Sequence, residues 1–403
     1  MHPVLSIGAY LIAQTITFWV AVWCTRHAGG PLLRGAAGKV LFVSFLVIYI
    51  ALLILPVLGA MLPDSRLKFD LQAAGNIWLG FDVYFSGLLL VLCLVCRIGH
   101  QLAARGRRAA WAVPVLLISV IAALVLMIYG MIHAQHTVQK EYDVTIEKDA
   151  GALEELKVVL IADLHMSVNS HLSMIRNMVD QINTLGADVI LIAGDIFTSS
   201  YEGLKDPDSY SAVLREMKST YGTFAVYGNH DVEETLFGGF PISPISKAFR
   251  TKQMEQFFED CAFQVLYDEV VTIADGAVQI AGRVDGEKAG DGTANRESPQ
   301  QLLREIDPAK PVIVLEHEPV EFAPLGENGA DLVLCGHTHA GQIFPGNLVV
   351  PFFNENGYGY KELGGVDTIV TSGIGYYGPP MRVGTNSEIT IVNVHFEKTG
   401  NAS

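Results

Sequence analysis

The sequence predicts an α/β domain that follows an all-helical apolar region. Four long apolar runs lie before residue 134, whereas short β-branched runs alternate with helical patterns beyond residue 155. The charge changes at the same place. Nine Lys/Arg and three acids precede residue 134, a net of +6, so a total of −15 leaves −21 for the remainder. This shift in charge and hydropathy predicts two regions with different surroundings.

The first region is predicted to be a bundle of membrane helices. A helix needs ~20 apolar residues to cross the hydrocarbon core of a bilayer, and the runs at about 4–24, 40–62, 77–96 and 110–133 meet that length. The first run is not preceded by Lys or Arg or followed by a small-residue cleavage site, so it is interpreted as a retained helix. Residues 1–134 are therefore expected to form a four-helix transmembrane region, and the chain a multi-pass protein of the plasma membrane.

The basic residues of the connecting loops predict the orientation of these helices. Cations cluster after the first and third helices, at Arg26, Arg34, Lys39, Arg97, Arg105, Arg107 and Arg108. The loop between the second and third helices has only Arg66 and Lys68, offset by Asp64 and Asp70. Since Lys and Arg are retained on the cytoplasmic side, the basic loops are expected there. Both termini, and the acidic region, are then expected outside the cytoplasm.

The remainder divides into a linker, a domain and a tail. Residues 135–154 are of mixed polarity and are interpreted as a linker, 155–396 as the domain and 397–403 as a tail. Strands are expected at 157–162, 188–193, 223–226, 311–315 and 331–334, and helices at about 172–185 and 209–218. Apolar strands separated by helices predict buried sheets with helical cover.

Each of these five strands is followed by polar side chains. They are Asp163 and His165, Asp195, Asn229 with His230 and Asp231, His317, and His337 with His339. One histidine after a strand is more often structural than a ligand. However, α/β sheets place their sites at the carboxyl ends of strands, and all of these residue types are ligands of hard or borderline metals. Buried together without cations they would repel one another. The pattern therefore predicts a metal centre.

These motifs resemble the calcineurin-like metallophosphoesterase superfamily, whose pattern is D-x-H, G-D, G-N-H-D, a lone His and G-H-x-H. The resemblance covers about residues 155–396. The later residues Gly341-Gln342, Thr371 to Gly375, Pro380 and Arg382 are similar to the branch in which the domain follows membrane helices. The resemblance implies a four-layer α/β sandwich with two central sheets, which the hydrophobic pattern alone does not predict.

The resemblance also implies a role for each residue. Asp163, His165 and His339 would hold one divalent ion, Asn229, His317 and His337 a second, and Asp195 would bridge them. Manganese, iron, zinc or similar ions suit such mixed ligands. Two such ions can bridge a hydroxide that attacks phosphorus in line. His230 is the expected general acid, with support of a neighbouring ligand as the alternative, and Asp231 is expected to orient it.

Three further features carry two interpretations each. Arg283 and Arg382 are candidate phosphate clamps, because a guanidinium can bind phosphate oxygens bidentately, but a solvated surface role is open for both. The segment 236–242, which follows the G-N-H-D motif, is unusually apolar. It is expected either to cover an edge of the core or to contact an acyl chain or the bilayer.

The expected activity is hydrolysis of a phosphodiester, phosphomonoester or pyrophosphate, with a lipid-linked compound as the preferred substrate. A tether of about 20 residues between the last membrane helix and the first catalytic strand would keep the site near the membrane. Nucleic acid is not an expected partner, because an acidic domain repels the phosphate backbone. The alternative is a lapsed enzyme that serves as a membrane-bound protein-binding module.

Overall fold

The computed structural model describes residues 3–27, 35–102, 111–237 and 240–397. The chain forms two compact units. The first comprises residues 1–132, 235–242 and 378–381, and the second comprises 133–234, 243–377 and 382–403. The predicted tail beyond residue 397, Gly238, Gly239 and the loop arginines Arg34, Arg105, Arg107 and Arg108 lie outside the described residues.

Four helices form most of the first unit: α1 (Pro3–His27), α3 (Ala36–Met61), α4 (Arg66–Leu102) and α5 (Ala112–His133). The predicted apolar helical region is thus confirmed. Within the described residues, three stretches are long and apolar enough to cross a membrane, namely Phe42–Met61, Arg66–Ile98 and Pro114–His133, whereas α1 has the shorter apolar stretch Leu11–Cys24. Helix α4 begins at Arg66 rather than near residue 77. Its 37 residues make it about 55 Å long, which exceeds a hydrocarbon core of about 30 Å.

A polar cluster lies among these helices. Asp82 is buried, and it accepts hydrogen bonds from Gln14 Nε2 and, at 3.3 Å, from Ser86 Oγ. Tyr49 Oη donates to Gln14 Oε1 at 2.8 Å. A carboxyl group inside an apolar bundle needs such partners, so this cluster fixes α1, α3 and α4 against one another.

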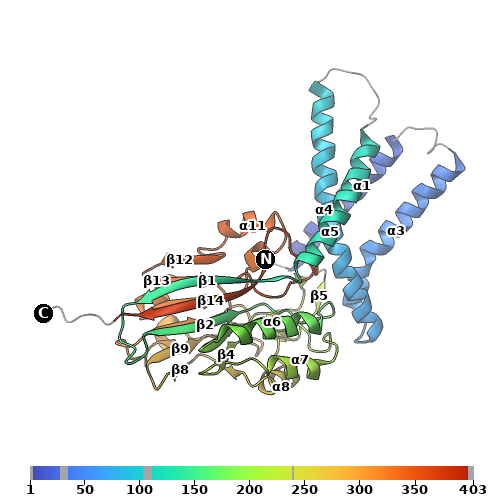
Figure 1. The fold of residues 1–403 in the computed structure, drawn as a ribbon. Coiled ribbons are helices and arrows are strands. Elements are labelled where there is room, and N and C mark those ends of the chain that lie inside the picture. The colour runs from blue at the N-terminus through green and yellow to red at the C-terminus, as the bar shows by residue number, and fades with distance from the viewer. Residues whose placement is uncertain (1–2, 28–34, 103–110, 238–239, 398–403) are drawn as a thin grey trace. The chain divides into compact units, whose positions relative to one another are not determined.

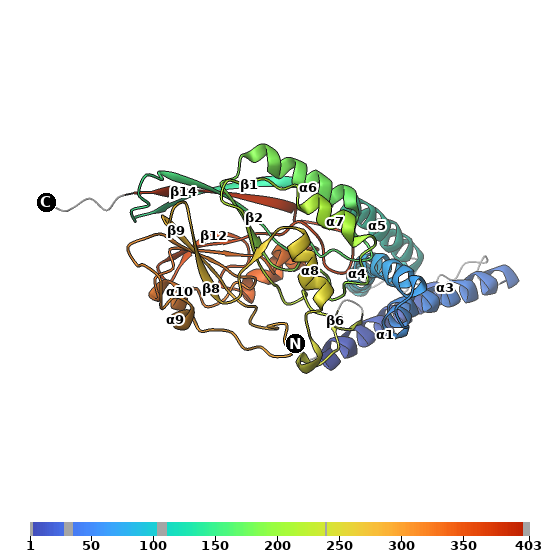
Figure 2. The same ribbon diagram turned by 90° about the horizontal axis from the view of Figure 1, so that it is seen from below.

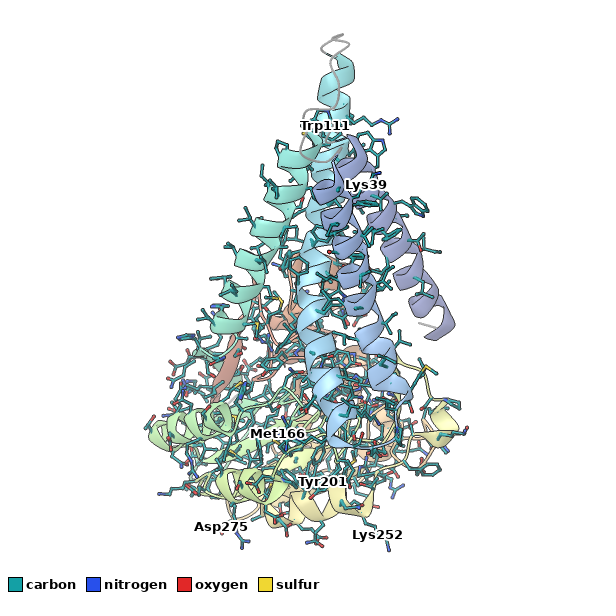
Figure 3. All side chains as sticks on the ribbon, turned by 90° about the vertical axis from the view of Figure 1, so that its right-hand side faces the viewer. Lys39, Trp111, Met166, Tyr201, Lys252 and Asp275 are labelled. Carbon is teal, nitrogen blue, oxygen red and sulfur yellow. The ribbon has the colours of Figure 1, made fainter. Side chains whose placement is uncertain are left out.

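The starts of α3 and α5 lie at the same end of the helical unit. Lys39 and Trp111 mark these two starts in Figure 3. The end of α1 reaches the same place, because the rings of Trp23 and Trp111 are 5.5 Å apart. The end of α1 and the starts of α3 and α5 are therefore at one end of this unit.

Two short segments from the acidic part of the sequence also belong to the first unit. Strands β5 (Leu236–Phe237) and β6 (Phe240–Pro241) form a hairpin that contacts α3 and α1. Residues 378–381 pack on α4, where a Cβ added at Gly80 would lie 2.6 Å from Met381 Sδ. The described residues of the apolar segment 236–242 thus pack on apolar helices of the first unit.

The second unit contains two six-stranded mixed sheets (Figure 1). The first sheet has the order β1-β14-β2-β3-β4-β7. Its strands are β1 (Thr137–Ile146), β14 (Ser387–Phe396), β2 (Glu155–Ile161), β3 (Val189–Ala193), β4 (Thr223–Val226) and β7 (Gln264–Val265). The second sheet has the order β12-β13-β11-β10-β9-β8. Its strands are β12 (Gly359–Leu363), β13 (Val366–Val370), β11 (Leu332–Cys335), β10 (Val312–Leu315), β9 (Val278–Gly282) and β8 (Glu269–Ile273).

The predicted linker is in fact a strand of the first sheet. Strand β1 pairs in parallel with β14 from Thr137 opposite Ser387 to Ile146 opposite Phe396. Its Val144 and Ile146 are buried in the core between the sheets. The linker prediction over 135–154 is therefore wrong, because the exposed face of β1 carries polar and charged residues that gave the segment its mixed character.

Successive side chains of a buried strand face different layers of the domain. In β2, Val159 and Ile161 face a core that includes α6, whereas Val158 and Leu160 face the second sheet. The outer face of the second sheet, with Val314, packs on α9 and α10. Helices α6 (Leu172–Leu185), α7 (Pro207–Leu214) and α8 (Lys252–Asp260) contribute to the outer core of the first sheet, and α9 (Pro299–Leu302) and α10 (Phe322–Glu327) to that of the second.

Figure 2 shows α6 and α7 on one outer side and α9 and α10 on the other, with the strands between them. The remaining short elements are η1 (Ile245–Lys247), η2 (His339–Gly341), α11 (Gly346–Val349) and η3 (Val350–Phe352). The predicted α/β fold with two central sheets is confirmed.

Candidate metal centre

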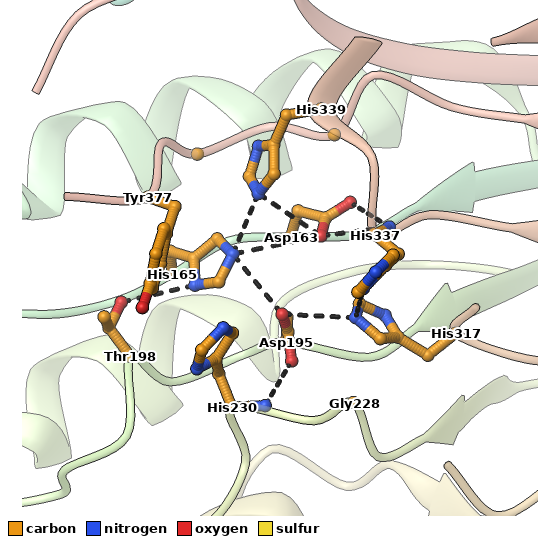
Figure 4. Close-up of polar contacts among 12 residues, drawn as sticks. Asp163, His165, Asp195, Thr198, Gly228, His230, His317, His337, His339 and Tyr377 are labelled. Carbon is orange, nitrogen blue, oxygen red and sulfur yellow. Dashed lines mark hydrogen bonds and ion pairs between the residues drawn. The ribbon is translucent and has the colours of Figure 1, made fainter. Parts of the chain in front are cut away.

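The predicted ligands converge from both sheets on one buried site (Figure 4). Asp163 and His165 follow β2, Asp195 follows β3, and Asn229 and His230 follow β4 of the first sheet. His317 follows β10, and His337 and His339 follow β11 of the second sheet. The five predicted strands thus deliver their polar ends to the same place.

Local backbone geometry turns these side chains inward. Residues with φ in the left-handed region are uncommon outside glycine, yet this conformation occurs at Asp163, His165, Asp195, His337 and His339, with φ between 44° and 73°. The glycines of the motifs allow close approach of the loops. A Cβ added at Gly228 would lie 2.2 Å from Asp195 Oδ1. The glycine of the G-N-H-D motif is therefore required sterically.

Asp163, His165 and His339 form the first cluster of donors. Their ligand atoms lie within 4.8 Å of one another, and His165 Nε2 and His339 Nε2 are 2.9 Å apart. His339 Nε2 is 3.5 Å from Asp163 Oδ1, and His165 Nε2 is 3.9 Å from the same oxygen. One carboxylate and two imidazoles thus face a common point.

Asp195 joins this cluster to a second one. Its Oδ2 lies 3.4 Å from His165 Nε2 and 3.2 Å from His317 Nε2. On the far side, His317 Nε2 is 3.1 Å from Asn229 Oδ1 and 3.2 Å from His337 Nδ1. The carboxylate of Asp195 therefore lies between the two sets of donors.

The orientation of His317 is fixed by the backbone. Its Nδ1 is 2.7 Å from the carbonyl oxygen of Ala193, and because a carbonyl can only accept, Nδ1 carries a proton that it donates. This leaves Nε2 to face Asn229 Oδ1 and Asp195. Such a hydrogen bond at the other ring nitrogen is typical of metal-binding histidines.

Burial and mutual repulsion make this cluster suited to cations. Burial raises the pKa of Asp163 to about 7, although His317 lowers it. Burial also lowers the pKa of His165 and His337 to about 3, so both imidazoles are neutral and can coordinate at neutral pH. His317 behaves in the opposite way: burial lowers its pKa, but Asp195 and Asp163 raise it well above its ordinary value. The carboxylates thus attract positive charge, and the mixed oxygen and nitrogen donors fit divalent metals.

His230 lies beside the cluster at one end of a buried polar chain. Its Nδ1 is 2.8 Å from Ser199 Oγ, and Ser199 Oγ donates to Glu234 Oε1 at 2.8 Å. Because the hydroxyl proton of Ser199 is donated to the Glu234 carboxylate, the oxygen of Ser199 accepts a hydrogen bond from Nδ1 of His230. Lys288 Nζ donates to the same Glu234 oxygen at 2.6 Å. The imidazole also stacks on Tyr377, with ring centroids 4.5 Å apart.

Sequence reasoning missed Ser199, Glu234, Lys288 and Tyr377. Glu234 follows His230 by four residues, which is a weak signal, and the other three come from separate loops. Asp231 was predicted to orient His230, but its carboxylate accepts instead from the backbone N–H groups of Asp195, Phe197 and Gly228, at 2.8 to 2.9 Å. It shapes the loops that carry Asp195 and Asn229.

The predicted phosphate clamps do not fit the structure. Arg283 is 1% exposed and bonds to Glu316 at 3.1 Å and Glu321 at 2.7 Å. Arg382 is fully buried, donates to the carbonyl oxygens of Ser372 and Gly375, and has its Nη2 at 3.3 Å from His339 Nδ1. Both guanidinium groups are thus engaged by the protein, and Arg382 supports the loop that carries His339.

Two mixed sheets with a buried cluster of aspartates and histidines at their strand ends form an α/β domain with a candidate metal site. Residues 156–341 match the family model of the calcineurin-like phosphoesterase domain. The resemblance drawn from the motifs is thereby confirmed.

Similar proteins from bacteria and vertebrates share this domain. A Helicobacter pylori protein named uncharacterized metallophosphoesterase is 34% identical over 245 residues, which is 60% of this chain and 60% of that protein. Proteins named transmembrane protein with metallophosphoesterase domain are 28% identical in Danio rerio, over 77% of this chain and 71% of theirs, and 29% identical in Bos taurus, over 68% and 61%. Together with the apolar helices, these names support membrane association.

Proposed function

We propose that this protein is a membrane-anchored, metal-dependent phosphoesterase that hydrolyses a phosphodiester, phosphomonoester or pyrophosphate. The observation that carries the proposal is the position of Asp195 Oδ2, between His165 Nε2 at 3.4 Å and His317 Nε2 at 3.2 Å. A carboxylate shared between two donor sets is the arrangement that a two-metal site requires.

The donors divide between two divalent ions such as manganese, iron or zinc. Asp163, His165 and His339 would hold one ion, Asn229, His317 and His337 the other, and Asp195 would contact both. When bound, the ions supply Lewis-acid activation of a water molecule and of the phosphoryl oxygens. The acidic groups around them hold the cations, while the neutral histidines leave the centre with net positive charge for an anionic substrate.

His230 is the proposed general acid. The contact with Ser199 holds a proton on Nδ1, so Nε2 is the ring atom left to deliver a proton to the departing alkoxide oxygen. The Glu234 carboxylate at the other end of the chain accepts the hydroxyl proton of Ser199 in a hydrogen bond and so fixes which way Ser199 faces His230. Stacking on Tyr377 fixes the plane of the ring.

A lipid-linked substrate is the proposed class. Segments 235–242 and 378–381 belong to the unit of apolar helices, and they directly follow site residues in the sequence, the first after His230 and Asp231 and the second after Tyr377. Such connections along the chain to apolar helices would tether the site to a bilayer and raise the local concentration of a lipid-linked substrate.

We further propose that the catalytic domain lies outside the cytoplasm, at the plasma membrane. The end of α1 and the starts of α3 and α5 share one end of the helical unit, and these helix ends flank the two basic loops in the sequence (Figure 3). The domain continues from α5, whose start lies at that end. Under the positive-inside rule, that end is cytoplasmic. A reporter fused after Ser403 should therefore be active outside the cytoplasm, and activity only inside would reverse the orientation.

Hydrolysis of an aryl phosphodiester by purified full-length protein tests the proposed activity. Turnover should require added divalent metal and fall to background in Asp195→Asn, whereas Asp180→Asn, at an exposed acid on α6, should keep it. A metal-loaded protein without turnover on monoesters, diesters or pyrophosphates would contradict the proposal. It would favour the alternative, a domain that serves as a protein-binding module.

A further inference from the structure

The α/β domain exposes an uncharged apolar surface. Residues 342–353 contain no Asp, Glu, Lys or Arg, although the chain beyond residue 134 carries −21. Five large hydrophobic side chains of this segment are exposed: Phe344 (47%), Leu348 (56%), Val349 (46%), Phe352 (84%) and Phe353 (81%). These five residues are called the 344–353 surface. Single exposed apolar residues are normal, but a cluster that includes two almost fully exposed phenylalanines marks an interaction site.

The backbone under this surface is well anchored. Phe344 N–H donates to the carbonyl of Val383 at 2.8 Å, and Gln342 bonds through its side chain to both N and O of Tyr377, at 2.8 and 3.0 Å. A Cβ added at Gly341 would lie 2.3 Å from Asn347 N, so the chain folds tightly on itself there. The aromatic side chains are therefore presented by an ordered turn and by α11 and η3.

One residue links this surface to the end of α5. Thr385 Oγ1 donates to the carbonyl of Gln342 at 2.8 Å, and the carbonyl of Thr385 lies 3.1 Å from His133 Nε2. His133 is the last residue of α5 and of the candidate membrane span Pro114–His133. The end of a membrane span lies at the bilayer interface. Within the second unit, the segment that carries the 344–353 surface is thus connected through Thr385 to the residue that tethers the domain to this span.

We propose that the 344–353 surface contacts the lipids of the bilayer. The bilayer is available as a partner because the protein is associated with a membrane. The contacts of Thr385 connect the surface to His133, at the end of a candidate membrane span. The absence of charge favours the same face, because burying a charged side chain at the boundary of headgroups and acyl chains costs desolvation free energy and residues 342–353 carry no charged side chain. Phenylalanine and leucine side chains are those that amphipathic segments bury at the boundary of headgroups and acyl chains. The inference concerns docking of the domain and does not depend on the proposed activity.

Fluorescence of the full-length protein in lipid nanodiscs tests this contact. A polarity-sensitive dye is attached at Phe352→Cys or, as a second site on the same surface, at Leu348→Cys. Glu305→Cys, at an exposed position near α9, is the matched control, and unsubstituted protein gives the background from the native cysteines. Quenching is then compared between nanodiscs with and without spin-labelled phospholipids.

Spin-labelled lipids should quench the dye at positions 352 and 348 severalfold more than at position 305, with blue-shifted emission at the two surface sites. Equal quenching at all three positions would overturn the proposal. Blue-shifted emission without lipid quenching, in particles that contain two copies of the chain, would overturn it in favour of self-association. Quenching at only one surface site would also contradict a continuous lipid-facing surface.

Discussion

At the scale of the residue, the candidate centre depends on side chains held in costly conformations. Asp163, His165, Asp195, His337 and His339 have positive φ, and each such residue costs about 1–3 kcal/mol. Burial adds a second cost, since Asp163 and Asp195 are removed from water. A fold tolerates this combination where function requires it, because the surrounding packing supplies the compensating stability.

The hydrogen bonds from His230 through Ser199 to Glu234 predict that substitutions here slow hydrolysis more for substrates with a poor leaving group. Ser199→Ala and Glu234→Gln should slow hydrolysis of an alkyl phosphodiester about 10- to 100-fold, part of the usual contribution of general acid catalysis. A p-nitrophenyl diester should be affected far less, because its leaving group needs no proton. Steady-state kcat on the two substrates measures this, with Ser173→Ala on α6 as the control. Equal losses on both substrates would contradict the role given to this chain.

Arg382 predicts a structural effect that is distinct from substrate binding. Arg382→Lys removes donors to the carbonyls of Ser372 and Gly375 and should cost about 2 kcal/mol, since bonds to a charged group contribute about 1.5–3 kcal/mol. For a domain of this size the melting temperature should fall by about 4–8 °C. Thermal denaturation checks this against Arg215→Lys at an exposed position. An unchanged melting temperature with a raised KM would instead restore the phosphate-clamp interpretation.

The sequence identifies candidate ligands well but not their supporting contacts. Asp195 or His317 can be picked out because each follows a predicted strand within a short motif. Ser199, Lys288 and Tyr377 lack such a signal, since their contact with the site depends on how separate loops fold together. For the same reason Arg283 and Arg382 were misjudged: burial of a charged side chain by distant carboxylates and carbonyls leaves no local pattern.

At the scale of the element, hydrophobic alternation decides what can be predicted. The buried strands β2, β3, β10 and β11 are nearly continuous apolar runs and were predicted within one or two residues. Strand β1 was missed because one of its faces is exposed and polar, and because its partner β14 lies about 250 residues further along the chain. Long-range pairing of this kind is invisible to local reasoning.

Two neighbouring substitutions in β1 test its place in the domain. Val144 is buried between the sheets, whereas Thr145 is exposed. Val144→Asp should destabilise the domain by about 3 kcal/mol or more, through lost apolar burial and a buried carboxyl group, whereas Thr145→Asp should stay within about 0.5 kcal/mol. Urea denaturation of both variants measures this. Equal stability would mean that β1 is dispensable, as the linker prediction implied.

At the scale of the whole molecule, we expect metal binding to stabilise the folded state of the α/β domain. Residues from both sheets surround the two donor sets, so a bound ion ties the sheets together. Ligand present at about 1,000 times its Kd stabilises the folded state by about 4 kcal/mol. Removal of the metal by a chelator should therefore lower the melting temperature of the domain by about 8–16 °C, and added manganese or zinc should restore it. A chelated protein with an unchanged melting temperature would contradict this coupling.

The number of divalent ions bound per chain tests the central claim most directly. Elemental analysis of the full-length protein, after saturation with metal and removal of the excess, should give two ions per chain. Asp195→Asn, which lacks the carboxylate between the two donor sets, should retain one or fewer. A saturated wild-type protein with fewer than two ions, or an Asp195→Asn variant with the full number, would contradict the account.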